Sequence, residues 1–174
     1  MRGWAAPIRS RAVDAPVTAG PALPCYRRLM SQPGIDAVTA EFFDAFDNRG
    51  GRVPDVDRLR RLMLPAGVIV VTRPRFVAYT VDEFIEPRRQ LLTDGRLVEF
   101  SEWETSQRTE VAGDIASRFL EYRKSGILNG EPFEGGGTKH MQFVRTPEGW
   151  RIAAVAWFDE PDLPPNGDAS GVRA

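Results

Sequence analysis

The chain has 174 residues, of which 42% are hydrophobic and 27% charged, and its formal net charge is −1. These values indicate a soluble globular protein of about one domain, without the broad positive surface that nucleic acid or an anionic membrane would require. The one cysteine, Cys25, excludes an internal disulfide and a cysteine-only zinc site. Among 23 basic residues only Lys124 and Lys139 are lysines, and we attribute this scarcity of lysine to a GC-rich genome.

The two ends of the chain differ in composition from its middle. Residues 1–33 are rich in Pro, Arg and Ala and show neither helical nor strand periodicity, which predicts a disordered leader that packs against nothing. Translation can start at Met1 or at Met30. Residues 161–174 are rich in Pro and Gly and predict a flexible tail. No apolar run reaches the ~20 residues that span a bilayer, so we expect a cytoplasmic protein.

Three helices are expected between residues 33 and 92. In "PGIDAVTAEFFDAFDNRGG" an apolar stripe that includes Ile35, Phe42 and Phe46 predicts an amphipathic helix, closed by two glycines. Residues 54–65, "PDVDRLRRLMLP", predict a shorter helix. Residues 80–92, "TVDEFIEPRRQLL", predict a third, kinked or broken at Pro87. Between the last two, "GVIVVTRP" and "RFVAYT" predict a strand hairpin.

Four long strands follow, in "RLVEFSEWETSQRTEV", "DIASRFLEYRKS", "GTKHMQFVRT" and "GWRIAAVAWF". Turn residues separate them at Gly113–Asp114, at 126–137 and at "TPEG", so three consecutive hairpins form an antiparallel meander. Helices that precede a run of strands indicate an α+β fold with the helices packed on one face of the sheet.

This order of elements resembles the nuclear transport factor 2-like superfamily, which includes SnoaL-type cyclases and ketosteroid isomerase. The segments that carry the resemblance are "IDAVTAEFFDAF", "GDIASRFLEYRKS", "GEPFEGGGTKHMQFVR" and "TPEGWRIAAVAWFDE". It implies a cone-shaped α+β domain over residues 34–160, in which three N-terminal helices pack on a curved, mainly antiparallel sheet around a pocket. Members of this superfamily include isomerases, hydrolases, cyclases, carriers and dimerisation modules, so the resemblance predicts no single activity.

Residue alternation predicts how such a pocket is lined. With Gly113–Asp114 as the turn, Trp103, Arg118 and Tyr122 share one face of their hairpin, whereas Glu102 and Glu104 lie on the opposite, solvated face, with Glu104 paired to Arg123. We expect the first group to line a small-molecule site. Phe46 lies on the first helix and Tyr79 at the rim. Trp103 and Tyr122 are alternatively plain core aromatics.

Arg118 is the one cation on the predicted pocket face. An unpaired buried arginine is costly, so it should pair with a nearby carboxylate or with an acidic group of the ligand. No cofactor is expected.

The last strand is apolar at almost every position, which predicts a cover on both of its faces. With "TPEG" as the turn, His140 opposes Val155, and both lie with Trp157 on the outer face. We expect a homodimer through this face, with His140, Val155 and Trp157 in the interface; the chain's own tail is the alternative cover. His140 is interpreted as structural or interfacial, with a pocket role or metal ligation as alternatives; no metal is expected.

Three functions remain open: a binding protein for a small apolar or acidic molecule, an acid–base enzyme (isomerase, cyclase or hydrolase of the SnoaL-like type), and a dimerisation module without a functional pocket. No catalytic residue is assigned. Ketosteroid isomerase-like chemistry needs a tyrosine where the first helix has Phe42, Phe43 and Phe46. Limonene-type epoxide hydrolysis needs an Asp–Arg–Asp cluster, for which Arg118 with Asp114 or Glu102 is a candidate.

Overall fold

The computed structural model describes residues 33–160, so the predicted leader, the Met30 start and the predicted tail lie outside the described residues. The helices are α1 (Pro33–Asp44), α2 (Leu59–Leu62) and α3 (Val81–Thr93), with 3-10 turns at Arg49–Gly51 and Val56–Arg58. The strands are β1 (Met63–Val71), β2 (Val77–Thr80), β3 (Leu97–Ala112), β4 (Ile115–Leu128), β5 (Glu131–Thr146) and β6 (Gly149–Asp159). None of the described helices has the length and apolar character that crossing a membrane requires.

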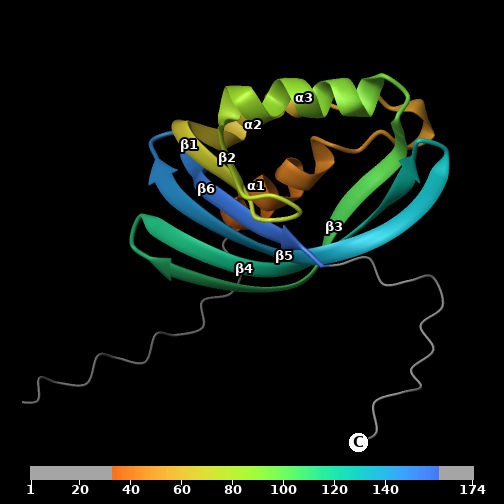
Figure 1. Cartoon of the computed structure of the whole chain (residues 1–174). Helices are drawn as coiled ribbons and strands as arrows, with labels where there is room; N and C mark the ends of the chain where they lie inside the picture. The colour runs from red at the N-terminus through yellow and green to blue at the C-terminus, as the bar shows by residue number, and fades with distance from the viewer. Residues whose placement is uncertain (1–32, 161–174) are drawn as a thin grey trace, which may run out of the picture.

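The six strands form one sheet in the order β2-β1-β6-β5-β4-β3. β1 runs parallel to β6, and every other pair of neighbours is antiparallel. The sheet is curved, and all three helices lie on its concave side (Figure 1). The predicted α+β class, with helices on one face of a mainly antiparallel sheet, is confirmed.

The second and third helices differ in detail from the prediction. The second is a single α-helical turn after a 3-10 turn, because the chain enters β1 at Met63 rather than at Gly67. The third runs through Pro87 without a break. It starts at a capping box, in which Thr80 Oγ1 accepts from the Glu83 amide while the Glu83 carboxylate accepts from the Thr80 amide at 2.8 Å.

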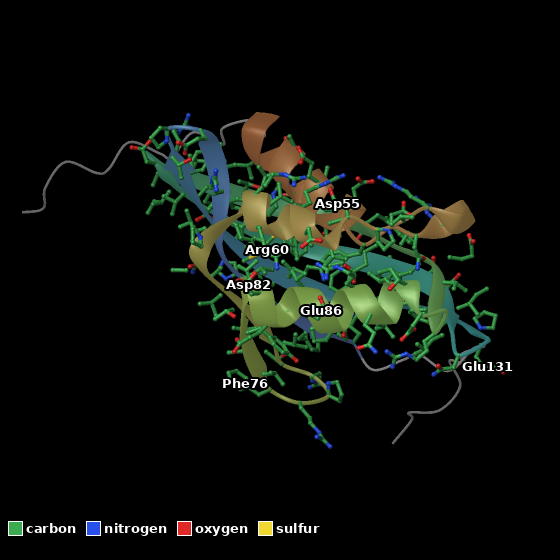
Figure 2. The ribbon with its side chains drawn as sticks, turned by 90° about the horizontal axis from the view of Figure 1, so that it is seen from above. Asp55, Arg60, Phe76, Asp82, Glu86 and Glu131 are labelled. Atoms are coloured by element: carbon green, nitrogen blue, oxygen red, sulfur yellow. The ribbon has the colours of Figure 1, made fainter. Side chains whose placement is uncertain are left out.

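Arginine–aspartate pairs hold the exposed sides of α2 and α3 together. Arg60 of α2 donates to Asp82 at the start of α3 over 2.8 Å, and Figure 2 shows the two on neighbouring elements when the helices are seen from above. Arg89 of α3 donates to both oxygens of Asp57 at 2.7 Å. Neither arginine lines a pocket between the helices and the sheet, and their side chains are 49% and 35% exposed.

The β5–β6 register departs from the prediction at one residue. Near the turn the predicted pairing holds, with Phe143 opposite Ile152. Gln142 then pairs with Ala154, so Ala153 is an extra, bulged residue. A one-residue insertion moves each later side chain to the opposite face. His140 therefore pairs with Ala156, and the predicted pairing of His140 with Val155 is wrong.

A second bulge changes the inner face of β3. Arg118 pairs with Thr109 as the Gly113–Asp114 turn predicts, but Glu104 pairs with Tyr122 and Thr105 has no partner. Glu102 and Glu104 therefore face the helices, and Trp103 faces away from them and is 45% exposed. The predictions of a solvated Glu104 beside Arg123 and of an inward-facing Trp103 are wrong.

An aromatic core joins the helices to the sheet. The rings of Phe42 and Phe46 in and after α1 meet edge to face at 5.4 Å, and Phe84 of α3 contacts Phe46 at 6.2 Å and Trp157 of β6 at 5.8 Å. Such pairs each add about 0.5–1.5 kcal/mol beyond the area that they bury. This series of ring contacts positions α1 and α3 over β6.

Candidate functional site

A cavity of about 190 Å³ lies between α1, α3 and the strands β3 to β6. We call it the cone cavity. Its apolar wall contains Phe42, Phe46, Phe84, Leu91, Leu97, Phe100, Leu128, Phe133 and Trp157, and its charged residues are Arg88, Glu102, Lys124, Lys139 and Asp159. An apolar cavity of about 150 Å³ holds benzene in other proteins, so this one has room for a single ring with a short substituent.

Lys139 is the most enclosed charged residue of the cone cavity. It lies on β5 between Leu120 of β4 and Trp157 of β6, and its side chain is 2% exposed. Its Nζ lies 3.7 Å from the ring centre of Tyr122, 4.6 Å from that of Trp157 and 5.7 Å from that of Phe43. Three aromatic rings thus surround the amine, an arrangement that stabilises a cation through the ring quadrupoles.

The carboxylate partner of Lys139 is Glu102 on β3. Nζ and Oε2 are 3.4 Å apart, which is longer than the 2.7–2.9 Å of a usual charge-assisted hydrogen bond. Burial lowers the pKa of Lys139 below its ordinary value, and the nearby carboxylates of Glu102 and Asp159 only partly oppose this shift. The ammonium form is therefore less favoured here than on a free lysine.

Asp159, at the end of β6, accepts hydrogen bonds from a tyrosine and from the second lysine. The Tyr122 phenol donates to Asp159 Oδ1, and Lys124 Nζ donates to the same oxygen over 2.7 Å. Burial, together with the Asp159 hydrogen bond and the charge of Glu102, raises the pKa of Tyr122 far above its usual value, so the phenol stays protonated. Although burial opposes the shift, the hydrogen bonds from Lys124 and Tyr122 lower the pKa of Asp159.

Arg88 is the cation at the border of the cone cavity. It is half-buried on α3, and its guanidinium lies 5.0 Å from the ring centre of Phe84. Arg89, the next residue, is held by Asp57 and Glu86, but within residues 33–160 no carboxylate lies within 4.0 Å of the Arg88 nitrogens. Arg88 is thus a cavity cation without a described anionic partner.

A second polar cluster centres on Arg118, which is 1% exposed. Its guanidinium donates to Asp36 of α1, to Glu104 at 3.2 Å and to Thr109 at 2.8 Å. Burial raises the pKa of Glu104 and Asp36 adds to this, whereas the charge of Arg118 opposes it. The cluster borders an open cleft of about 520 Å³ beside α1, which we call the α1 cleft. The sequence predicts that Arg118 pairs either with a nearby carboxylate or with an acidic group of the ligand. In the structure it pairs with the carboxylates of Asp36 and Glu104.

The predicted pocket residues are divided between these two regions. Phe46 lines the cone cavity, and the ring of Tyr122 lies under Lys139. Tyr79 is half-buried and packs on Phe84 at 5.8 Å without lining the cavity. Trp103 borders only the α1 cleft. Arg118 also borders that cleft, so the predicted group of Trp103, Arg118 and Tyr122 does not meet at one pocket.

The residues predicted for a dimer interface lie on both faces of the sheet. Val155 is fully buried and Trp157 is 8% exposed, and both point toward the helices, so their predicted place on the outer face is wrong. The bulge at Ala153 is the reason. His140 does lie on the outer face, where its Nε2 is 2.7 Å from Ser117 Oγ.

Sequence reasoning missed the charged residues of the cone cavity. One signal was available: the chain has two lysines among 23 basic residues, and both line this cavity. A compact ammonium fits an aromatic enclosure and can lose its proton, whereas an arginine stays charged and needs several acceptors. In a chain that otherwise uses arginine, the two lysines were therefore a signal that pointed to this cavity.

No protein-family model and no curated protein matches the sequence. Solved structures do match its fold, and one is the Kfla4162 protein from Kribbella flavida, with a TM-score of 0.63 and 16% identity over 76% of this chain and 92% of that one. Another is a nuclear transport factor 2-like protein with a cystatin-like fold from Novosphingobium aromaticivorans, with a TM-score of 0.57 and 18% identity over 79% of this chain and 84% of that one.

The chain has the nuclear transport factor 2-like fold. The resemblance drawn from the sequence is confirmed at this level. LinA is similar too, with a TM-score of 0.60 and 14% identity over 80% of this chain and 93% of LinA. Identities this low transfer the nuclear transport factor 2-like architecture and no activity, so function has to be argued from the cavity and the cleft themselves.

Proposed function

We propose that the protein binds a small, mainly apolar acid in the cone cavity. The observation that carries this proposal is Arg88, a half-buried cation that borders an aromatic cavity and has no described carboxylate partner. Pockets for small molecules combine apolar walls with a few polar groups that set the orientation of the ligand. Arg88 is suited to that task because a guanidinium binds a carboxylate through two parallel hydrogen bonds.

The charge balance of the cone cavity supports an anionic ligand. Lys139 faces Glu102, and Lys124 faces Asp159, so these four charges compensate in pairs. Arg88 remains, and a ligand with one negative charge would complement it. The cavity volume of about 190 Å³ favours an acid with one aromatic ring or a short branched chain.

Benzoate and phenylacetate are suitable probes, with benzyl alcohol as the uncharged comparison. Trp157 lines the cavity, so its fluorescence should report binding, and calorimetry provides a second readout. We expect Arg88→Met to weaken benzoate binding at least about tenfold, because the loss of a charge-assisted hydrogen bond costs ~1.4 kcal/mol or more of binding free energy. Arg89→Met is the matched control, because Arg89 pairs with Asp57 on the outside of the helices.

Two results would contradict this proposal. If benzyl alcohol binds as tightly as benzoate, the negative charge of the ligand does not contribute to binding. If wild type and Arg88→Met bind benzoate with equal affinity, Arg88 does not bind the carboxylate.

A second candidate function is acid–base catalysis at the α1 cleft. Glu104, whose pKa burial raises, is suited to donate a proton, and Asp36 is suited to accept one, with Arg118 between them. Opening of an epoxide by water uses such a pair, because the ring oxygen gains a proton while the attacking water loses one. Styrene oxide is a test substrate, and Glu104→Gln should abolish diol formation. No diol above the uncatalysed rate with wild type would exclude this reaction.

A homodimer through the outer face of the sheet also remains a proposal, with different anchors from those predicted. Phe119 and Ile115 are 53% and 60% exposed on β4, and Phe119 lies 6.3 Å from His140 between ring centres. Truncating a central aromatic anchor costs ~2 kcal/mol or more. Phe119→Glu should therefore shift a dimer toward monomer in sedimentation, and a wild type that is monomeric at micromolar concentration would exclude the dimer.

A further inference from the structure

Lys139 has a property that ligand binding by Arg88 does not require. Its amine is buried among Tyr122, Trp157 and Phe43, on a strand whose other inward residues nearby are Met141 and Phe143. Replacing a buried ion pair by apolar side chains is often neutral or stabilising. A lysine at this position therefore calls for a role that uses the amine itself.

The surroundings of Lys139 favour a nucleophilic amine. Lys139 lines the cone cavity, so a molecule bound there lies next to its side chain. Burial removes the water that would solvate the ammonium, and the nearby carboxylates oppose this only in part. The Glu102 carboxylate at 3.4 Å can accept the proton that the ammonium loses. Lys124 differs, because its Nζ donates to Asp159 over a shorter distance of 2.7 Å.

We propose that Lys139 forms a covalent imine with an aldehyde or ketone bound in the cone cavity. Glu102 first accepts a proton from the ammonium, leaving a neutral amine. The Nζ lone pair attacks the carbonyl carbon, a C–N bond forms, and the carbonyl electron pair moves to oxygen. Transfer of the nitrogen proton to that oxygen completes a carbinolamine.

Loss of water from the carbinolamine gives the imine. The nitrogen lone pair forms the C=N bond as the hydroxyl leaves with the proton returned by Glu102. The resulting cationic imine keeps the positive charge between the same three rings, which continue to stabilise it. The overall change joins one amine to one carbonyl compound and releases one water, so no oxidant, reductant or metal is needed.

This inference rests on the cone cavity as the binding site, and its test is separable from that of Arg88. Full-length protein is incubated at pH 7 with benzaldehyde and sodium cyanoborohydride, which reduces an imine to a stable benzylamine. Peptide mapping by mass spectrometry then locates the label. We expect Lys139 to be labelled at least about tenfold faster than Lys124, because Asp159 holds the Lys124 amine at 2.7 Å whereas the carboxylate partner of Lys139 is 3.4 Å away.

Three variants test the assignment. Lys139→Arg should lose the label at this position, because a guanidinium does not form the imine. His140→Gln, the neighbouring residue on the opposite face, should label as wild type does. Arg89→Met, whose guanidinium is held by Asp57 and does not line the cone cavity, should also label as wild type does. Labelling of the wild type by the uncharged benzaldehyde does not depend on whether benzoate binds, so the two tests stay separate.

The wild type alone can overturn the proposal. In urea the preference for Lys139 should disappear, because unfolding removes the aromatic enclosure. Labelling of Lys124 or the N-terminal amine at the rate of Lys139 in the folded protein would refute it. A preference for Lys139 that survives unfolding would refute it as well, since the fold would then not be its cause. This comparison stays decisive if Lys139→Arg fails to fold.

Discussion

Gly137 of β5 is the position where the smallest possible change should have the largest structural effect. It lies between β4 and β6, opposite Tyr122 on one side and Asp159 on the other. A Cβ at Gly137 would come 2.1 Å from the backbone oxygen of Phe158 and 3.1 Å from the Cα of Asp159. Both atoms belong to the backbone, so no side-chain rotation can relieve the contact.

The size of the effect follows from this distance. Cβ contacts under 3.0 Å essentially do not occur, so β5 and β6 must separate locally by about 0.9 Å in Gly137→Ala. Overpacking of this kind costs about 1–3 kcal/mol, and we expect the upper end because the atoms in contact all belong to the backbone of β6. At about 3–6 °C per kcal/mol for a domain of this size, Tm should fall by about 10–15 °C. The shift also displaces Asp159 from Tyr122 and Lys124.

Calorimetry or circular dichroism measures this difference directly. Gly126→Ala, in β4, is the matched control, because its Cβ would come no closer than 3.2 Å to a neighbouring atom. Its Tm should fall by less than about 5 °C, the equivalent of ~1 kcal/mol. If Gly137→Ala melts within 2 °C of wild type, or Gly126→Ala is the less stable of the two, the argument from close approach fails.

Three further predictions concern stability. Asn48→Ala should cost about 2–4 kcal/mol in urea unfolding, because the buried amide donates to two backbone carbonyls and accepts from the Phe100 amide; a cost under 0.5 kcal/mol would contradict this. Trp157→Ala should cost about 3–5 kcal/mol by the same assay, whereas an unchanged stability would place Trp157 on the surface. The pKa of Lys139 is lowered in the folded protein, so between pH 8 and 9.5 the unfolded chain holds this proton more firmly than the folded one, and the free energy of unfolding should rise with pH. Lys139→Met should remove that contribution. Identical slopes of unfolding free energy against pH for both proteins would refute it.

The sequence by itself determined the order of the elements and the turns at Gly113–Asp114 and at "TPEG". The turn predicted over residues 126–137 is wrong in length, because β4 continues to Leu128 and β5 begins at Glu131. The apolar stripe of α1, the span of α3 and the hairpin turn at Gly113–Asp114 are local features, because each depends on residues within a few positions of one another. The strand registers are also correct close to the turns, as Arg118 opposite Thr109 and Phe143 opposite Ile152 show.

Only the tertiary structure decided which side chains meet in the cone cavity. The bulges at Thr105 and Ala153 carry no sequence signal of their own, yet they turn Glu102 and Trp157 inward and Trp103 outward. A bulge allows a strand to bend at the expense of one unpaired residue, and the sheet as a whole curves around the helices (Figure 1). Lys139 and Glu102 are 37 residues apart in the chain and meet across this curved sheet. Their contact depends on the curvature of the whole sheet, which no short segment encodes.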